Sequence, residues 1–207
     1  MKKNFYTKNY FFGLSITIFI LSVIAFSDNL LTDVGQPSNS DPIMIIHGLI
    51  MFAWTIILII QTNHVRKMNI AQHKKLGIVG FFIAILMLLS INYLAYLGPD
   101  FNELPFFGKA NRIFVPVFAV MLIFAYLKRY NKLLHQYLIF VGLLFCMEPI
   151  LSRFCGNLDL NPMVFAFPIW IGLWISIFIY DIILRRKLHP ILYLGFIFFL
   201  GVYIIIS

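Results

Sequence analysis

Three histidines occupy matching positions in the chain: each follows a basic segment and stands at the start of an apolar run. They are His73 in Gln72-His73-Lys74-Lys75-Leu76-Gly77, His135 in Leu134-His135-Gln136-Tyr137 leading to Gly142, and His189 in Leu188-His189-Pro190-Ile191 leading to Gly195. Neutral imidazole binds transition metals and haem iron. If the three rings converge, they could hold a cofactor near one membrane face. A half-polar ring also suits the membrane interface and can satisfy backbone groups at a helix end, so a structural role stays open.

One chemical hypothesis built on these residues is a metal centre. His73, His135 and His189 would bind zinc or iron, and Asp181 would be a fourth ligand or a base. The alternative for His73 and His135 is axial ligation of a b-type haem. A third possibility is that the chain binds no cofactor.

A second group of ionisable and polar side chains is expected deeper in the membrane, in its outer third. Such residues are costly within a span and therefore indicate a functional site. Glu148 lies roughly 20 Å from His135 along a continuous helix, at about the depth expected for His47. The predicted cluster consists of His47, Asn92, Arg112, Glu148 and Arg153. It could be a buried ion pair that fastens helices, a site for an anionic or quinone-like ligand, or a proton-transfer pair.

The elements that must position these groups are seven apolar helices. The chain has 207 residues, of which 61% are apolar and 12% charged, with a mean hydropathy of +0.92. These values are typical of a membrane protein, and several uncharged runs approach the roughly 20 residues that a bilayer core requires. The predicted runs are Tyr10–Phe26, Ile43–Gln61, Leu76–Leu97, Ile113–Leu127, Tyr137–Leu151, Met163–Ile183 and Ile191–Ile206.

The repeated histidine segments indicate how the predicted helices pair. Each opens the third, fifth or seventh helix, so helices two to seven are predicted to form three hairpins. Pro149, Pro116 and Pro168 are expected to kink their helices and open space in the bundle. We therefore predict an all-α integral membrane bundle of about seven transmembrane helices, in which residues 1–207 form a single transmembrane domain.

Basic residues in the loops predict the orientation, because Lys and Arg are retained on the cytoplasmic side. With the N-terminus inside, only Lys109, Arg112 and Arg153 fall outside. The remaining Lys and Arg residues, all in the N-terminal segment or in loops, lie inside. The net charge of +8 then serves insertion and attraction to anionic lipid, and no nucleic-acid partner is expected. We expect a bacterial inner (cytoplasmic) membrane, a retained first helix and an external C-terminus.

The run His47…Met51…Trp54, followed by a basic turn and His73, resembles a stretch of about 30 residues in the di-haem transmembrane cytochrome b family that passes ascorbate electrons across membranes. The resemblance implies that His73 and His135 are the cytoplasmic haem pair and that His47 is one ligand of an outer haem. The fourth helix offers Asn111 and Arg112 and no histidine for the second outer ligand. The whole chain also resembles a group of bacterial multi-span proteins without an assigned activity.

Three functional hypotheses follow from the sequence. The first is b-type haem electron transfer through His73 and His135. The second is a zinc- or iron-dependent membrane enzyme. The third is a non-enzymatic small transporter or a subunit of a membrane complex, with a membrane protein or a quinone-like molecule as its partner.

Overall fold

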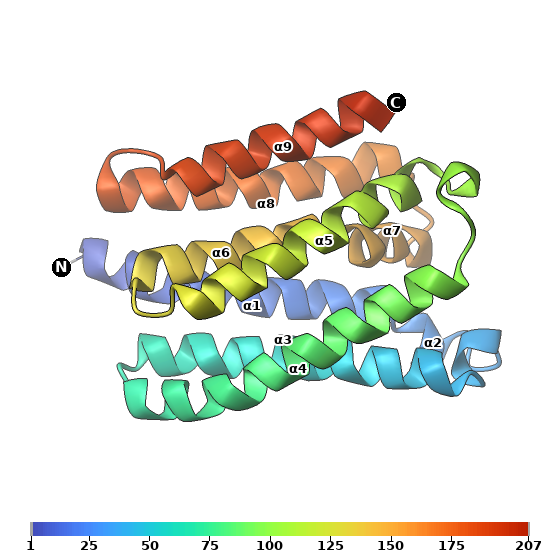
Figure 1. The fold of residues 1–207 in the computed structure, drawn as a ribbon, viewed down its shortest axis with the longest axis horizontal. Coiled ribbons are helices and arrows are strands. Elements are labelled where there is room, and N and C mark those ends of the chain that lie inside the picture. The colour runs from blue at the N-terminus through green and yellow to red at the C-terminus, as the bar shows by residue number, and fades with distance from the viewer. Residues whose placement is uncertain (1, 207) are drawn as a thin grey trace. The chain divides into compact units, whose positions relative to one another are not determined.

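The computed structural model describes residues 2–206, and within that range the chain is helical with short connections and no strand (Figure 1). The long helices are α1 (Lys2–Ala25), α3 (Pro42–Arg66), α4 (Ile70–Leu97), α5 (Phe106–Leu127), α6 (Lys132–Phe145), α7 (Glu148–Asn157), α8 (Pro162–Arg185) and α9 (Pro190–Ile206). Three short elements lie between them: α2 (Asp28–Leu31), η1 (Pro37–Asn39) and η2 (Phe101–Glu103). The prediction of an all-α protein is confirmed.

Among the described residues, four helices are long and apolar enough to cross a bilayer: α3, α4, α5 and α8. A fifth span results if α6 and α7 are counted together, although the chain bends by 48° at the break between them. The apolar segments Asn9–Ala25 and Pro190–Ile206 are shorter. The structure therefore contains four to five candidate membrane spans.

Local chemistry explains where several helices begin and end. The Asp41 side chain accepts a hydrogen bond from the Ile43 N–H at 2.8 Å, and Pro42 occupies the first turn, where its missing N–H costs nothing. Asn131 caps α6 in the same way through the Leu134 N–H. Arg186 has a φ of 62°, a left-handed conformation that ends α8 directly after Arg185.

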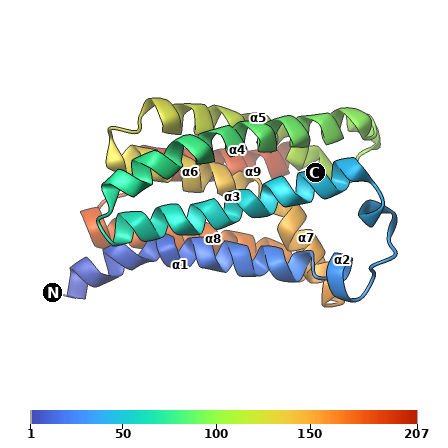
Figure 2. The ribbon, with the colours of Figure 1, turned by 90° about the horizontal axis from the view of Figure 1, so that it is seen from below.

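The chain divides into two compact units, each built from two separate stretches. The first comprises residues 1–90 and 150–165. In this unit α1 packs along α3 (Figure 2), and the hydroxyl groups of Ser15 and Thr62 lie 2.9 Å apart. Gly80 of α4 faces Ile57 of α3, where an added Cβ would lie 3.2 Å from the isoleucine side chain.

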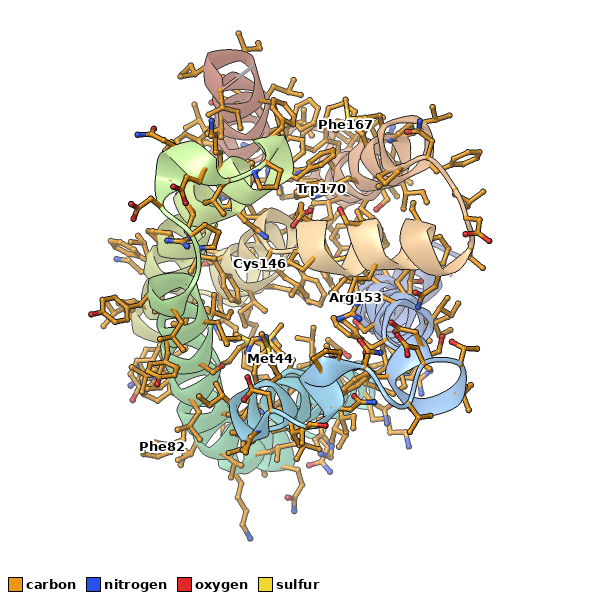
Figure 3. The ribbon with its side chains drawn as sticks, turned by 90° about the vertical axis from the view of Figure 1, so that its right-hand side faces the viewer. Met44, Phe82, Cys146, Arg153, Phe167 and Trp170 are labelled. Carbon is orange, nitrogen blue, oxygen red and sulfur yellow. The ribbon has the colours of Figure 1, made fainter. Side chains whose placement is uncertain are left out.

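The second unit comprises residues 91–149 and 166–207, and in it α5 packs against both α6 and α9. Its core is aromatic: Phe114, Trp170 and Phe199 are buried, and the Trp170 and Phe199 ring centres are 4.8 Å apart. Trp170 stands one turn beyond Phe167 on α8 (Figure 3). Aromatic contacts of this kind add to the stability that apolar burial provides.

The predicted fifth run, Tyr137–Leu151, is not one continuous helix. Helix α6 ends at Phe145 and α7 begins at Glu148, immediately before Pro149. The N–H groups of Cys146 and Met147 turn back to the carbonyl groups of Leu143 and Leu144. The proline kink expected from the sequence therefore takes the form of a complete break, and the carboxylate of Glu148 stands at it.

Candidate functional site

Asp181 is the most enclosed charged side chain among the described residues of the second unit, with no exposed surface. Its Oδ1 accepts hydrogen bonds from the Tyr137 hydroxyl and, at 2.5 Å, from the Arg185 Nε. Its Oδ2 accepts from the second Arg185 nitrogen at 2.7 Å and from the His189 backbone N–H at 2.6 Å. One carboxylate thus joins α6, α8 and the start of α9, and these charge-assisted bonds offset the cost of burying it.

His189 acts as a helix cap. Its ring Nδ1 accepts a hydrogen bond from the Ile191 N–H at 3.2 Å, so the proton of the neutral ring is on Nε2. Burial lowers the pKa of His189 below its usual 6.5, the Arg185 charge lowers it further, and the Asp181 charge opposes them. The ring is therefore neutral at pH 7, as an acceptor role requires.

His135 also satisfies a backbone group at a helix end, but it does so as a hydrogen-bond donor, whereas His189 accepts. Its Nδ1 lies 2.8 Å from the backbone carbonyl of Ala125 in the last turn of α5. A carbonyl only accepts, so this nitrogen carries the proton and the ring lone pair is on Nε2. Two of the three repeated histidines thus satisfy backbone groups at helix ends, which agrees with the structural interpretation of the repeat. The third, His73, is on α4 in the first unit.

The surroundings of Asp181 do not suit a metal ion. Both carboxylate oxygens already receive two donors each, and one of the donor groups is the cationic guanidinium of Arg185. The contribution of His189 to this carboxylate is its backbone N–H and not its imidazole. Within residues 2–206, no three His, Cys, Asp or Glu side chains are grouped so that they could hold a metal.

Glu148 lies at the break between α6 and α7 and is half-buried. The Asn111 side-chain amide of α5 donates to its carboxylate at 2.7 Å. Tyr203 of α9 is close enough to interact electrostatically with this carboxylate. The Tyr203 hydroxyl is buried and has no hydrogen-bond partner among the described residues, although its ring packs against Phe106, Phe114, Phe199 and Trp170.

The other members of the predicted outer cluster have partners that the sequence did not indicate. Arg153 pairs with Asp28 at 2.9 Å, donates to Gln36 and lies over the Phe26 ring. The carboxylate of this ion pair therefore belongs to the segment after α1. Asn157 of α7 also donates to Asp28 and to the last carbonyl groups of α1, which ties α7 to α1 and α2 in the first unit.

The remaining members of the predicted cluster are His47, Arg112 and Asn92. The Ser90 hydroxyl hydrogen donates to the Met87 carbonyl, so Ser90 Oγ accepts from His47 Nδ1 at 3.0 Å and links α3 to α4. Arg112 donates to the Pro99 carbonyl at 3.1 Å. Asn92 is exposed on α4.

Nothing in the local sequence distinguishes several residues of these sites. Tyr137 and Tyr203 lie in apolar runs where aromatic residues are common. Asn111 lies on a helix that offers no histidine, and its sequence gives no sign of a contact with Glu148. Arg185 offered a usable signal, since it follows Asp181 by four residues on one helix face, the spacing of an ion pair. Comparisons with protein-family models, curated proteins and solved structures found no match to this chain.

Proposed function

We propose that the protein is a seven-span bundle of a bacterial inner membrane, with its N-terminus in the cytoplasm, its C-terminus outside and α3–α9 arranged as three hairpins. The four long apolar helices, the α6/α7 pair and the two shorter apolar segments supply the elements for seven crossings. The basic loops around residues 66–75, 128–132 and 185–187 supply the orientation.

Within that bundle, we propose a small transporter that moves protons, alone or in exchange for a monovalent cation, at the α6/α7 break. The observation that carries this proposal is the position of Glu148, an acidic side chain in an apolar helix pair at the point where the helix is interrupted. Transporters commonly bind coupling ions at such interruptions, where helix ends and freed backbone groups replace water.

The neighbours of Glu148 suit this task. Asn111 fixes one carboxylate oxygen by a hydrogen bond, and the unpartnered Tyr203 hydroxyl adds a polar group on the α9 side of the same carboxylate. A carboxylate, an amide and a phenol offer oxygen ligands to a small cation, and the carboxylate also accepts a proton. Binding of either ion would neutralise the only acidic residue between Glu103 and Asp159.

The test is ion movement in vesicles that contain the purified protein and an internal pH-sensitive dye. We expect internal pH to change when a membrane potential is imposed, or when Na⁺ or K⁺ is added outside an acid-loaded vesicle. Glu148→Gln should abolish this change, and Asn111→Ala should reduce it severalfold. Glu103→Gln removes an exposed carboxylate and is the matched control. Flux no faster than in protein-free vesicles, or unaltered flux in Glu148→Gln, would refute the proposal.

A second candidate function is b-type haem binding through His135 and His73, and the hydrogen bond of His135 favours it. Haem ligands commonly donate one ring N–H to a backbone carbonyl and direct the other nitrogen to iron, which is the tautomer that Ala125 imposes. The absorption spectrum of the purified protein, oxidised and dithionite-reduced, tests it. A Soret band lost in His135→Ala and in His73→Ala would support haem; a colourless protein expressed with ample haem would reject it.

A further inference from the structure

An open apolar groove of about 480 Å³ runs along α5 in the second unit. One wall is the α5 face from Pro116 to Phe124, and the opposite wall is formed by Leu134, Leu138 and Ile191. Lys128 lines its end, directly after α5. We propose that this groove binds one acyl chain of an anionic phospholipid and that Lys128 binds the phosphate. The site is independent of the Glu148 site.

The length of the groove fits an acyl chain of one leaflet. From Pro116 to Lys128 the helical rise is roughly 18 Å. The hydrocarbon core of a bilayer is about 30 Å thick, so one leaflet contributes about half of that depth. A chain with its headgroup at Lys128 would therefore reach the far end of the groove near the middle of the bilayer.

The α5 wall is accessible where the chain would lie. Val120 is 51% exposed and Phe124 is 48% exposed, so an occupant would bury apolar surface that the described part of the protein leaves uncovered. Leu138 on the opposite wall is buried and gives the groove a floor. Covering this apolar area is favourable where it would otherwise face water. In a bilayer, the favourable term is the van der Waals packing of the acyl chain against the groove.

The charge at the Lys128 end selects the headgroup. Lys128, Arg129 and Lys132 are exposed in one short loop, and no acidic residue occurs between Glu103 and Glu148 to offset them. Arg129 is held over the rings of Tyr126 and Tyr130, at 4.5 and 4.7 Å from their centres. A basic loop with flanking tyrosines is typical of the headgroup region of a bilayer. Its positive charge complements a lipid headgroup whose net charge is negative.

Lipid retention by the detergent-purified protein tests the proposal, with phosphatidylglycerol as the anionic probe and phosphatidylcholine as the zwitterionic one. Bound lipid is counted by native mass spectrometry. We expect about fivefold preference for phosphatidylglycerol, since one Lys near the headgroup is worth about 1 kcal/mol. Lys128→Gln should remove the preference, and Lys109→Gln in the first turn of α5 should keep it.

A second variant tests the groove itself. Val120→Trp fills it from an exposed position and should reduce retention of both lipids, whereas Ile123→Trp, equally exposed on α5 but outside the groove, should not. Equal retention of the two lipids by the unmodified protein would overturn the proposal. So would a dimer that Val120→Trp dissociates, because the groove would then hold a second copy.

Discussion

At the scale of single residues, replacing Asp181 is expected to lower the stability of the protein more than replacing an exposed aspartate. Its removal in Asp181→Ala leaves Arg185 without its counter-ion and the Tyr137 hydroxyl and His189 N–H without their acceptor. Breaking a buried pair in this way costs about 3–5 kcal/mol. We expect a large fall in the unfolding midpoint of the detergent-solubilised protein, followed by circular dichroism. Asp100→Ala, at an exposed loop position with an ordinary extended backbone, is the control, and an equal effect there would contradict the assignment.

The ion pair of Asp28 and Arg153 is expected to make the stability of the protein depend on pH. Burial alone raises the pKa of Asp28, but the hydrogen bonds from Arg153, Asn157 and Gln36 and the Arg153 charge together lower it below 3.8. The stability from this carboxylate is therefore fully present above the unfolded pKa and is lost as pH falls through the folded pKa. Unfolding midpoints measured from about pH 6 to about pH 3 should fall less steeply in Asp28→Asn than in the unmodified protein. Asp33→Asn, an exposed neighbour, should follow the unmodified curve.

The sequence predicts which single residues matter better than it predicts their partners. The types of residue that would matter, such as Glu148, Asp181 and Arg153, could be selected because ionisable groups are rare in apolar runs. Their partners could not, because the contact between Arg153 and Asp28 joins distant parts of the chain and depends on tertiary packing. The role of His189 was partly predictable: a histidine directly before a helix-opening proline is in position to cap that helix.

At the scale of elements, the glycine that follows His135 explains how α5 and α6 pack. A Cβ on Gly142 would lie 3.0 Å from the Phe118 ring and 3.2 Å from the Met121 Cβ. Small residues let membrane helices approach closely, and overpacking costs about 1–3 kcal/mol. We therefore expect Gly142→Ala to lower the unfolding midpoint. Gly172→Ala, where nothing beyond the adjacent residues and the local helix backbone lies within 4 Å of the added carbon, should leave it unchanged or raise it. Equal effects would show that helix propensity and not packing decides the outcome.

Helix positions were predictable from apolar length, since each of the seven runs is helical for most of its extent. The break before Glu148 was not fully predictable. Pro149 indicated a kink, but a proline is also tolerated in the first turn of a new helix, and only the structure shows that α7 begins there. Whether the chain reverses or continues after such a break is decided by packing and by the membrane.

At the scale of the whole molecule, the number of crossings is tested by labelling introduced cysteines on intact cells with a membrane-impermeant maleimide. The positions are Gly35, Tyr130 and Leu158, which are exposed and lie in three different connections. Seven spans with the N-terminus inside place Gly35 outside and Tyr130 inside, because α3, α4 and α5 separate them. Gly35→Cys should therefore label in intact cells, and Tyr130→Cys only after lysis.

Leu158 distinguishes the two possible roles of the α6/α7 pair. If the bent pair crosses the bilayer, Leu158 lies on the opposite face from Tyr130 and Leu158→Cys labels in intact cells. If the pair is a re-entrant loop, the two residues share a face, and both label only after lysis. The first result is the one we expect, because the partly exposed Arg153–Asp28 ion pair joins α7 to the segment after α1, near Gly35 in sequence. The second would remove one crossing and reverse the side of α9, yet it would keep Glu148 at an interrupted helix.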